Sequence, residues 1–250
     1  MELESGYRLD DLMIGGFRLI QNTKQFCFGT DSVLLADFAV SHTKGRDRVA
    51  ELCCGNGAVS ILMLARRIEN HITGFELQRD VCGLCERNIE LNSLGEHMDV
   101  VNTDLKLIGA EHYNTYDAVV VNPPYYSPGR GPRIEDENRR LSREEGTADL
   151  ADIVTVAKKM IKTKGKLIMV HRASRLGELT EVLASAGFAL KTLRCVHSKA
   201  GSPASLVLVS ASKLGGAWCD IEPPVIIYND DGSYTKDLLK IYHMDGEEDR

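Results

Sequence analysis

The sequence predicts an α/β fold, with a doubly wound and mainly parallel sheet covered by helices on both faces. Stretches with helical periodicity alternate with short apolar runs through most of the 250 residues, which is typical of a parallel sheet built from βαβ units. One run, at 118–121, is Ala-Val-Val-Val, which is too apolar for anything but a buried parallel strand. A glycine-rich turn follows the first run of the sheet, and folds of this class bind their ligands at such turns.

The elements are expected in a simple order. A hairpin at 17–28 and a helix capped by Thr30, Asp31 and Ser32 and running through Val40 precede the sheet. Strands are expected at 48–53, 71–77, 98–105, 116–122, 165–171, 188–196 and 205–210. Helices are expected at 58–69, 79–92, 150–162 and 175–185. Only a loop separates the last two strands, so we expect them to pair antiparallel.

The length favours a single domain with a substantial core. Within 1–250 we expect a hairpin and helix at 1–47, a cofactor-binding core at 48–213 and an acidic tail at 214–250. The tail begins near Pro223-Pro224, and an Asn-Asp-Asp-Gly turn between residues 226–228 and 234–235 predicts one more small hairpin.

The composition excludes several classes of protein. With 43% hydrophobic and 26% charged residues the chain is typical of a globular protein, and no apolar stretch approaches the roughly 20 residues of a membrane-spanning helix. The acidic N-terminus lacks the basic and apolar blocks of a secretory signal. Seven cysteines, two of them adjacent at Cys53 and Cys54, do not suit a disulfide framework. We therefore expect a cytoplasmic protein with reduced thiols.

Cys82 and Cys85 have the C-x-x-C spacing of zinc and redox sites. No second pair and no nearby histidine accompanies them, and the segment 79–92 has helical periodicity. Cysteines on such a face behave as small buried hydrophobic residues. We expect no metal site here.

The charge is distributed unevenly along the chain. A formal net charge of −6 argues against binding nucleic acid by bulk attraction. Residues 158–199 nevertheless carry ten Lys or Arg and only two acids, whereas 219–250 is strongly acidic. Two interpretations remain open for the basic stretch: one basic surface, or lysines on solvated faces of different elements.

Polar residues and glycines mark the ends of three successive expected strands. The first strand ends with Glu51 and leads through Gly55 and Gly57 into a helix, where backbone closely approaches a ligand. Ser60 stands where a dinucleotide fingerprint needs its third glycine, which disfavours pyrophosphate binding. Glu76 suits the hydroxyl pair of a ribose, and Asp104 suits the amine of an adenine. Together they predict a nucleoside cofactor.

The most specific motif is Asn122-Pro123-Pro124-Tyr125, at the end of the fourth strand. Two prolines make a stiff turn, which holds the Asn amide and a prolyl carbonyl in place without an ordering cost at binding. These two acceptors suit both hydrogens of a planar NH₂ group, and the tyrosine suits stacking on its ring. The motif predicts a site for a planar amine.

Over residues 28–210 the chain resembles the class I S-adenosylmethionine-dependent methyltransferases, and among them the N-P-P-Y branch that methylates planar nitrogens. The resemblance implies a seven-stranded sheet with an antiparallel last strand. It assigns the target amine to Asn122, Pro123, Pro124 and Tyr125. It assigns cofactor binding to Glu51, Cys53, Gly55, Gly57, Glu76, Asp104 and Asn122. The family usually has glycine where this chain has Cys53, so we expect a slightly displaced loop.

Within that branch the chain is most similar to the bacterial enzymes that methylate N6 of adenine 37 in a valine tRNA. The segment 28–36, the Asn-Pro-Pro-Tyr-Tyr motif, the basic loop after it and His197-Ser-Lys199 carry this resemblance. It implies that Thr30 and Asp31 lie beside the methionine end of the cofactor. It also implies direct methyl transfer without a metal, an RNA partner, and no obligate protein partner.

An RNA substrate needs a phosphate-binding surface, because the target base must leave its stack. Residues expected to bind RNA are Arg130, Arg133, Arg139, Arg140, Arg143 and Lys199. Three acids at 135–137 lie among the arginines. A flexible basic flap and an exposed salt-bridged loop both remain open for this segment.

Other substrates remain open as well. The same motif serves enzymes that methylate glutamine N5 in release factors, although those carry a sizeable helical domain before the sheet and only about 47 residues precede it here. Guanine N2 in ribosomal RNA and adenine N6 in DNA are further alternatives, and 250 residues leave little room for a DNA-recognition domain. A noncatalytic RNA-binding module is the alternative from a different class, which the absence of cofactor binding would favour.

Overall fold

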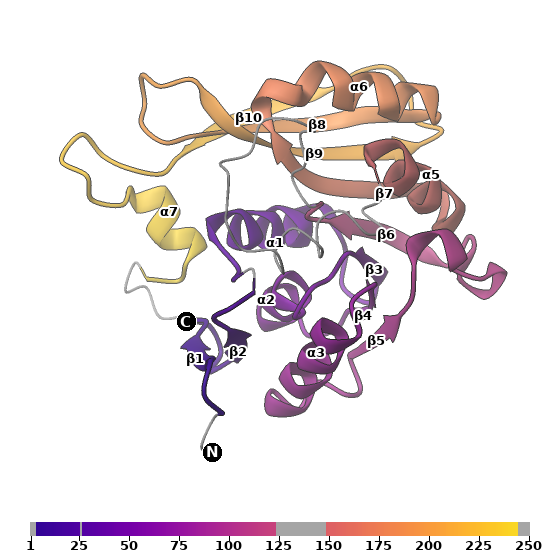
Figure 1. Cartoon of the computed structure of the whole chain (residues 1–250). Coiled ribbons are helices and arrows are strands. Elements are labelled where there is room, and N and C mark those ends of the chain that lie inside the picture. The colour runs from indigo at the N-terminus through magenta and orange to yellow at the C-terminus, as the bar shows by residue number, and fades with distance from the viewer. Residues whose placement is uncertain (1–3, 26, 124–148, 245–250) are drawn as a thin grey trace.

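The computed structural model describes residues 4–25, 27–123 and 149–244 (Figure 1), and its centre is an eight-stranded sheet. The strands are β3 (Arg48–Leu52), β4 (His71–Glu76), β5 (Met98–Asn102), β6 (Tyr116–Val121), β7 (Ile161–Arg172), β8 (Phe188–His197), β9 (Ala204–Lys213) and β10 (Asp220–Ile226). They lie in the order β10-β8-β9-β7-β6-β3-β4-β5. Only β9 runs antiparallel to its neighbours, β7 and β8, so the predicted fold class is confirmed. The expected count of seven strands is wrong, because the parallel edge strand β10 is added after the antiparallel strand β9.

Helices cover both faces of this sheet (Figure 1). One face carries α1 (Thr30–His42), α2 (Ala58–Arg66) and α3 (Arg79–Leu91), and the other carries α5 (Leu150–Met160) and α6 (Leu176–Ser185). The apolar run of β6 explains why both faces are covered. Ala118 and Val120 belong to the core under α1, whereas Val119 and Val121 belong to the core under α5. No helix within the described ranges is long and apolar enough to span a membrane.

The N-terminal hairpin lies earlier in the chain than expected. It pairs β1 (Tyr7–Asp11) with β2 (Arg18–Asn22), so the predicted range of 17–28 is wrong. The first strand reads Tyr-Arg-Leu-Asp-Asp, in which only Tyr7 and Leu9 give a short apolar alternation, and Leu9 is exposed. Its antiparallel pairing with β2, rather than its own composition, makes it a strand.

The expected cap of helix α1 is also wrong. Gly29 is the N-cap residue and no side chain caps the helix, although Thr30, Asp31 and Ser32 form its first turn as expected. All three side chains bond to other parts of the chain instead, Asp31 and Ser32 to Asn122 and Thr30 to Tyr242. The first turn of α1 therefore faces the site described below.

The C-terminal segment adds an edge strand to the sheet and ends in a short helix. The strand β10 pairs in parallel with β8, and its register shifts between Glu222 and Val225, across the two prolines. An edge strand tolerates proline because no further strand needs its missing N–H. The expected hairpin is reduced to a single antiparallel bridge between Tyr228 and Tyr234. The following helix α7 (Lys236–Ile241), capped by Thr235, was not expected.

Candidate active site

The strand-end residues that the sequence singles out meet at one edge of the sheet. Parallel strands β3, β4 and β6 bring Glu51, Glu76 and Asn122 to their carboxyl ends. The first turn of α1 joins them, because the Asn122 side chain contacts Asp31. In doubly wound folds this edge is where ligands bind.

The loop from β3 to α2 needs left-handed backbone at three positions. The φ angles are +56° at Cys53, +59° at Gly55 and +84° at Gly57. A Cβ atom on Gly57 would lie 2.7 Å from the Cys85 sulfur, so this position also lacks space for a side chain. Cys53 adopts the left-handed conformation as a non-glycine residue, at a cost of roughly 1–2 kcal/mol. Glycine would adopt this conformation without that cost.

Glu51 lies beneath this loop and is 2% exposed. Its carboxylate accepts hydrogen bonds from the Ser60 backbone N–H, at 3.0 Å, and from the Ser60 hydroxyl. Burial raises the pKa of Glu51 to about 8, and the Ser60 hydrogen bonds oppose this shift. Ser60, which replaces the third glycine of the dinucleotide motif, thus ties the end of β3 to the first turn of α2.

Glu76 lies at the end of β4 and faces the same loop. One carboxylate oxygen accepts the Gly55 N–H at 3.0 Å and the other accepts the Gln78 N–H at 2.9 Å. Burial raises its pKa, although the backbone hydrogen bonds oppose this. A carboxylate accepts about four hydrogen bonds, so acceptor capacity remains for a pair of hydroxyls.

The loop leaves open space at Gly55, close to Glu76. A Cβ atom built on Gly55 would meet nothing within 4 Å, so the backbone leaves room at this point. The combination of open space at Gly55 and a carboxylate with spare acceptor capacity matches the sugar of a nucleoside cofactor.

Asn88 of α3 fixes the loop from behind, a role that sequence reasoning missed. Its amide donates to the backbone oxygens of Asn56 and Ile20, each at 3.0 Å, and accepts from the Ile20 N–H at 2.7 Å. It therefore joins the loop, α3 and the N-terminal hairpin. In the sequence, the one signal for this role is an asparagine on the apolar face of an expected helix. The structure shows that this Asn88 is fully buried.

Asn122 is the residue at which the site is chemically incomplete. Its NH₂ group donates to the Asp31 carboxylate at 3.2 Å and to the Ser32 hydroxyl at 3.4 Å. A carboxylate can only accept, so Asp31 forces the amide to turn its nitrogen toward α1. The Asn122 carbonyl oxygen is buried and has no hydrogen-bond partner among the described residues. A buried acceptor of this kind is costly unless a ligand supplies a donor.

A tyrosine from the C-terminal segment reaches the same turn of α1. The Tyr242 hydroxyl donates to the Thr30 hydroxyl at 3.2 Å. Thr30 and Asp31 therefore lie near Asn122, and their expected place beside the methionine end of the cofactor stays a prediction. Ser32 and Tyr242 are additions that the sequence did not indicate. Both residues lie far from Asn122 along the chain, so no local sequence pattern predicts that they meet near it.

Asp104 is used by the backbone that follows β5. Its carboxylate accepts the Lys106 N–H at 2.8 Å and caps the short 3₁₀ helix η1 (Leu105–Leu107). This turn ends β5 at Asn102, so the strand stops before the predicted residue 105. The role of Asp104 toward an adenine stays a prediction.

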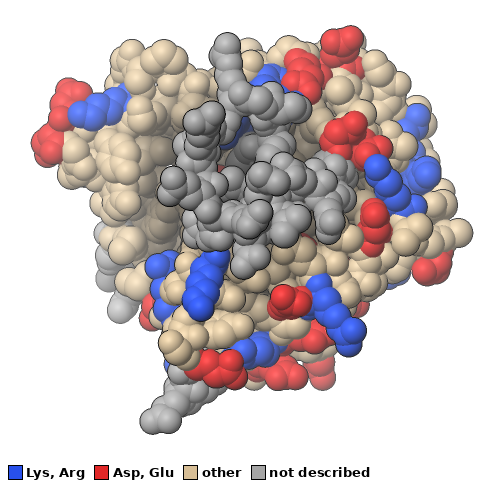
Figure 2. Space-filling model, in the orientation of Figure 1, with Lys and Arg blue, Asp and Glu red and all other residues tan. Residues whose placement is uncertain are grey.

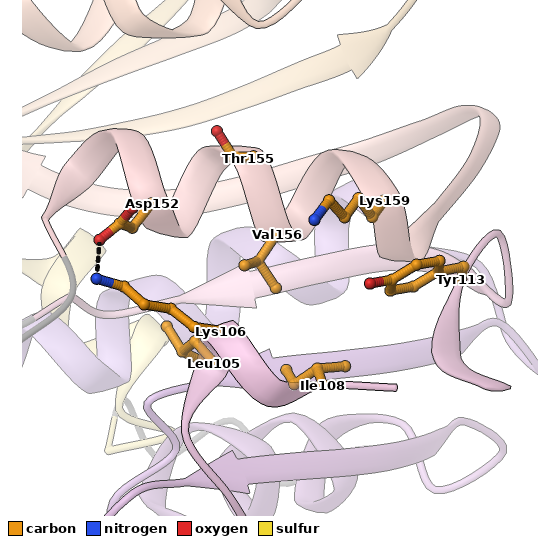
Figure 3. Close-up of a pocket in the computed structure, with 8 residues that line it drawn as sticks. All are labelled: Leu105, Lys106, Ile108, Tyr113, Asp152, Thr155, Val156 and Lys159. Atoms are coloured by element: carbon orange, nitrogen blue, oxygen red, sulfur yellow. Dashed lines mark ion pairs between the residues drawn. The ribbon is translucent and has the colours of Figure 1, made fainter. Parts of the chain in front are cut away.

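A small cavity of about 150 Å³ lies between η1 and α5 (Figure 3). It is lined by Leu105, Lys106, Ile108, Tyr113, Asp152, Thr155, Val156 and Lys159. An ion pair between Lys106 and Asp152, at 2.8 Å, lies at its edge. Drug-sized ligand sites are usually about 300–1,000 Å³, and none of the predicted cofactor residues lines this cavity. It is separate from the candidate active site.

Several predicted residues lie outside the described residues. These are Pro124, Tyr125, Arg130, Arg133, Arg139, Arg140 and Arg143. Pro123 is described and buried. Lys199 lies in the exposed loop from β8 to β9, where its ammonium donates to the Asp230 backbone oxygen at 3.1 Å.

The basic stretch at 158–199 is spread over different elements. Lys162 pairs with Asp117 at 2.7 Å, and Lys166 donates to the His42 backbone oxygen at 2.7 Å. On the face shown in Figure 2, basic and acidic side chains of the described residues are interspersed. Cys82 and Cys85 are buried in α3 as expected, and within the described ranges no group of three potential metal ligands occurs.

Comparison with known proteins adds the evolutionary context. A relative from Tolumonas auensis, named tRNA1(Val) (adenine(37)-N6)-methyltransferase, is 29% identical over 199 residues, which cover 79% of this chain and 81% of the relative. A relative with the same name from Yersinia pseudotuberculosis is 26% identical over 190 residues, 75% of this chain and 73% of the relative.

Solved structures share the fold at low sequence identity. A predicted O-methyltransferase from Agrobacterium tumefaciens superposes with a TM-score of 0.68 at 20% identity, covering 88% of this chain and 99% of that protein. TYW2 of M. jannaschii, solved in complex with AdoMet, gives a TM-score of 0.58 at 11% identity, covering 85% and 87%.

The family model described as methyltransferase small domain matches residues 24–187, about two thirds of the chain. The matched range contains α1, the loop at Gly55, Glu76 and Asn122. It confirms the predicted enzyme class, a methyltransferase that uses S-adenosylmethionine. The chain therefore belongs to the methyltransferase small domain family.

Proposed function

We propose that this protein transfers a methyl group from S-adenosylmethionine to the exocyclic N6 amine of adenine 37 in a valine tRNA. The carbonyl oxygen of Asn122, which is buried and has no hydrogen-bond partner among the described residues, carries the proposal, because an incoming amine would supply a donor. The names of the curated relatives support the choice of this amine and this RNA. A cytoplasmic location, where tRNA is available, is part of the proposal.

The residues at the carboxyl edge divide the work between cofactor and amine. S-adenosylmethionine supplies, when bound, an electrophilic methyl group on a sulfonium sulfur. Glu76 would accept from the ribose hydroxyls, and the loop through Gly55 would lie against the cofactor. Glu51 holds this loop from below through Ser60.

Asn122 is proposed to help the amine react, because this amine is a poor nucleophile. The lone pair of an adenine N6 amine is delocalised into the ring. A hydrogen bond from the amine to the Asn122 oxygen would orient that lone pair and favour a pyramidal nitrogen as positive charge develops. Asp31 accepts a hydrogen bond from the nitrogen of this amide, and would thereby keep its oxygen turned toward the substrate. The prolyl carbonyl of Pro123 is proposed as the second acceptor of the same amine.

The RNA side of the proposal depends partly on residues outside those described. Tyr125 is proposed to stack on the flipped adenine, and the arginines at 130–143 and Lys199 are proposed to contact phosphates. Replacing Arg139, Arg140 and Arg143 would then weaken tRNA binding and reduce its salt dependence.

Parallel methylation assays test the proposal. The protein is incubated with labelled S-adenosylmethionine and, separately, with total tRNA, ribosomal RNA, DNA and a peptide release factor, followed by nucleoside or peptide mass analysis. We expect N6-methyladenosine in tRNA alone. A valine tRNA transcript with guanine at position 37 is the matched control and should stay unlabelled.

The other outcomes identify the alternatives. Label in ribosomal RNA, DNA or the release factor would keep the enzyme class and replace the substrate. Saturable cofactor binding without label in any substrate class would refute the proposed reaction, and the absence of cofactor binding as well would favour a noncatalytic RNA-binding module.

A further inference from the structure

We propose that the C-terminal segment provides a stacking platform for an unpaired RNA base that neighbours the methylated adenine. The platform is a tyrosine row made of Tyr228, Tyr234 and Tyr242. The ring centroids of Tyr228 and Tyr234 are 5.4 Å apart with planes at 23°, and those of Tyr234 and Tyr242 are 6.3 Å apart with planes at 11°. The proposal rests on the proposed function, because it names the surface that would hold the base next to its target.

The backbone holds the tyrosine row in place without a ligand. Tyr228 and Tyr234 form an antiparallel bridge on either side of a tight turn. In that turn the Asn229 N–H donates to the Ser233 oxygen at 2.8 Å, and the Asp231 carboxylate accepts from the Ser233 N–H at 2.9 Å. A preformed aromatic surface loses little conformational entropy on binding.

The inner end of the row touches the candidate active site. The Tyr242 hydroxyl donates to Thr30 at 3.2 Å, and the next residue, Asp31, holds the Asn122 amide. The outer rings, Tyr228 and Tyr234, are 37% and 44% exposed. The row thus runs from the amine site to the surface, as a support for a base beside a flipped adenine must.

The surroundings of the row suit single-stranded RNA. Lys199, Lys236 and Lys240 are exposed, and within the described part of the chain none of the three forms an ion pair within 4.0 Å. Lys199 nevertheless lies close enough to the Asp231 carboxylate to help lower its pKa. Aromatic rings with nearby lysines are the usual combination for binding unpaired nucleotides, in which stacking tolerates any base. Asp230 and Asp231 in the turn limit the phosphate contribution, so stacking is the main expected contact.

The attachment of the C-terminal segment does not depend on the two outer rings. The Arg66 guanidinium donates to the Ile241 backbone oxygen at 2.7 Å, and Leu238 and Ile241 are buried in the core under α1. Replacing Tyr228 or Tyr234 should therefore leave the position of α7 unchanged. This separates a binding role of the rings from a structural one.

The test uses the full-length protein and a valine tRNA carrying 2-aminopurine at either neighbour of adenine 37. We expect Tyr228→Leu and Tyr234→Leu each to raise the dissociation constant for tRNA by about 10-fold. The emission of 2-aminopurine in the complex should be higher for the leucine variants, because the base loses its stacking partner. Affinity for S-adenosylmethionine and thermal stability should stay unchanged.

Two variants provide matched controls. Tyr234→Phe keeps the ring and should bind tRNA like the wild type. Trp218→Leu removes an aromatic residue that is 64% exposed but lies before β10, at the opposite end of this strand from Tyr228, and should also have no effect.

Each remaining outcome decides one hypothesis. If the wild-type protein methylates tRNA while both leucine variants keep its affinity and its 2-aminopurine emission, the platform is refuted and the proposed function stands. If the wild-type protein neither binds nor methylates tRNA, the proposed function is refuted and the platform with it.

Discussion

The cofactor side of the site, with Glu51 and Glu76, and the amine side, with Asn122, differ in how far the protein itself satisfies their buried polar groups. On the cofactor side, the buried carboxylates of Glu51 and Glu76 each accept two hydrogen bonds from the protein itself. On the amine side, Asn122 donates twice to α1, but its buried carbonyl oxygen has no partner among the described residues. The comparison teaches that the loop at Gly55 is held by the protein itself, whereas the proposed function would have the substrate amine complete the site at Asn122.

The largest effect is expected when the Asn122 amide, whose oxygen has no partner among the described residues, is removed. Asn122→Ala should lower kcat by about 10²–10³-fold, as expected for loss of a group that stabilises developing charge. Affinity for S-adenosylmethionine should change little, because the Asn122 side chain bonds to α1 and not to the cofactor loop, although the resemblance assigns Asn122 to the cofactor as well. Single-turnover methylation and a cofactor titration measure the two effects. A loss of cofactor affinity as large as the loss in kcat would contradict the assignment to the amine.

The pH dependence of the free energy of unfolding tests how the protein holds the buried Glu51 on the cofactor side. The pKa of Glu51 is about 8 in the folded protein and 4.5 in the reference state. Since the folded-state pKa is raised, the contribution of Glu51 to stability is full below pH 4.5 and is lost as pH rises toward 8. The expected loss is about 1.4 kcal/mol per pH unit within this window, as an upper bound for a buried group.

The variant Glu51→Gln isolates this effect. It cannot ionise, so its stability relative to the wild type should increase between pH 5 and pH 8 and then level off. Urea unfolding of both proteins across this range measures the difference, and a constant offset from the lost Ser60 geometry does not affect the slope. Parallel stability curves would show that Glu51 ionises normally in the fold.

Asp31→Asn tests whether Asp31 sets the orientation of the Asn122 amide. An asparagine at this position both donates and accepts, so it no longer fixes the direction of the Asn122 amide. We expect kcat to fall by about 10-fold, equivalent to the loss of one hydrogen bond to a charged group. If Asp31 acts through Asn122, the double variant with Asn122→Ala should be no slower than Asn122→Ala alone. Additive losses would instead indicate an independent role, such as direct contact with the cofactor.

The smallest effect is expected at Cys53. Cys53→Gly removes left-handed strain but also the packing of the sulfur, whereas Cys53→Ala loses the sulfur and keeps the strain. The glycine variant should therefore be more stable than the alanine variant by about 1 kcal/mol. Urea unfolding of the pair measures this difference. Equal stability would mean that the loop relaxes around a side chain at this position.

Much of the fold was predictable because its signals are local. The Ala-Val-Val-Val run predicted a buried strand, and β6 is buried on both faces. The hairpin at 7–22 was misplaced, because its first strand is polar and depends on its partner. The strand β10 was missed for a related reason. Its Pro223-Pro224 pair reads as a chain break in sequence, and only its place at the sheet edge permits it.

The sequence by itself determined the class of protein and the residue types of its site. Periodicity, the glycine turn and the motif at Asn122 act over a few residues, so one sequence reveals them. The tertiary structure decided which partners these residues take. Asp31 lies 91 residues from Asn122, and Tyr242 lies 212 residues from Thr30. Such pairs meet only after the strands have assembled and brought their carboxyl ends to one edge, and no local pattern encodes which hydrogen-bond donor will face which acceptor there.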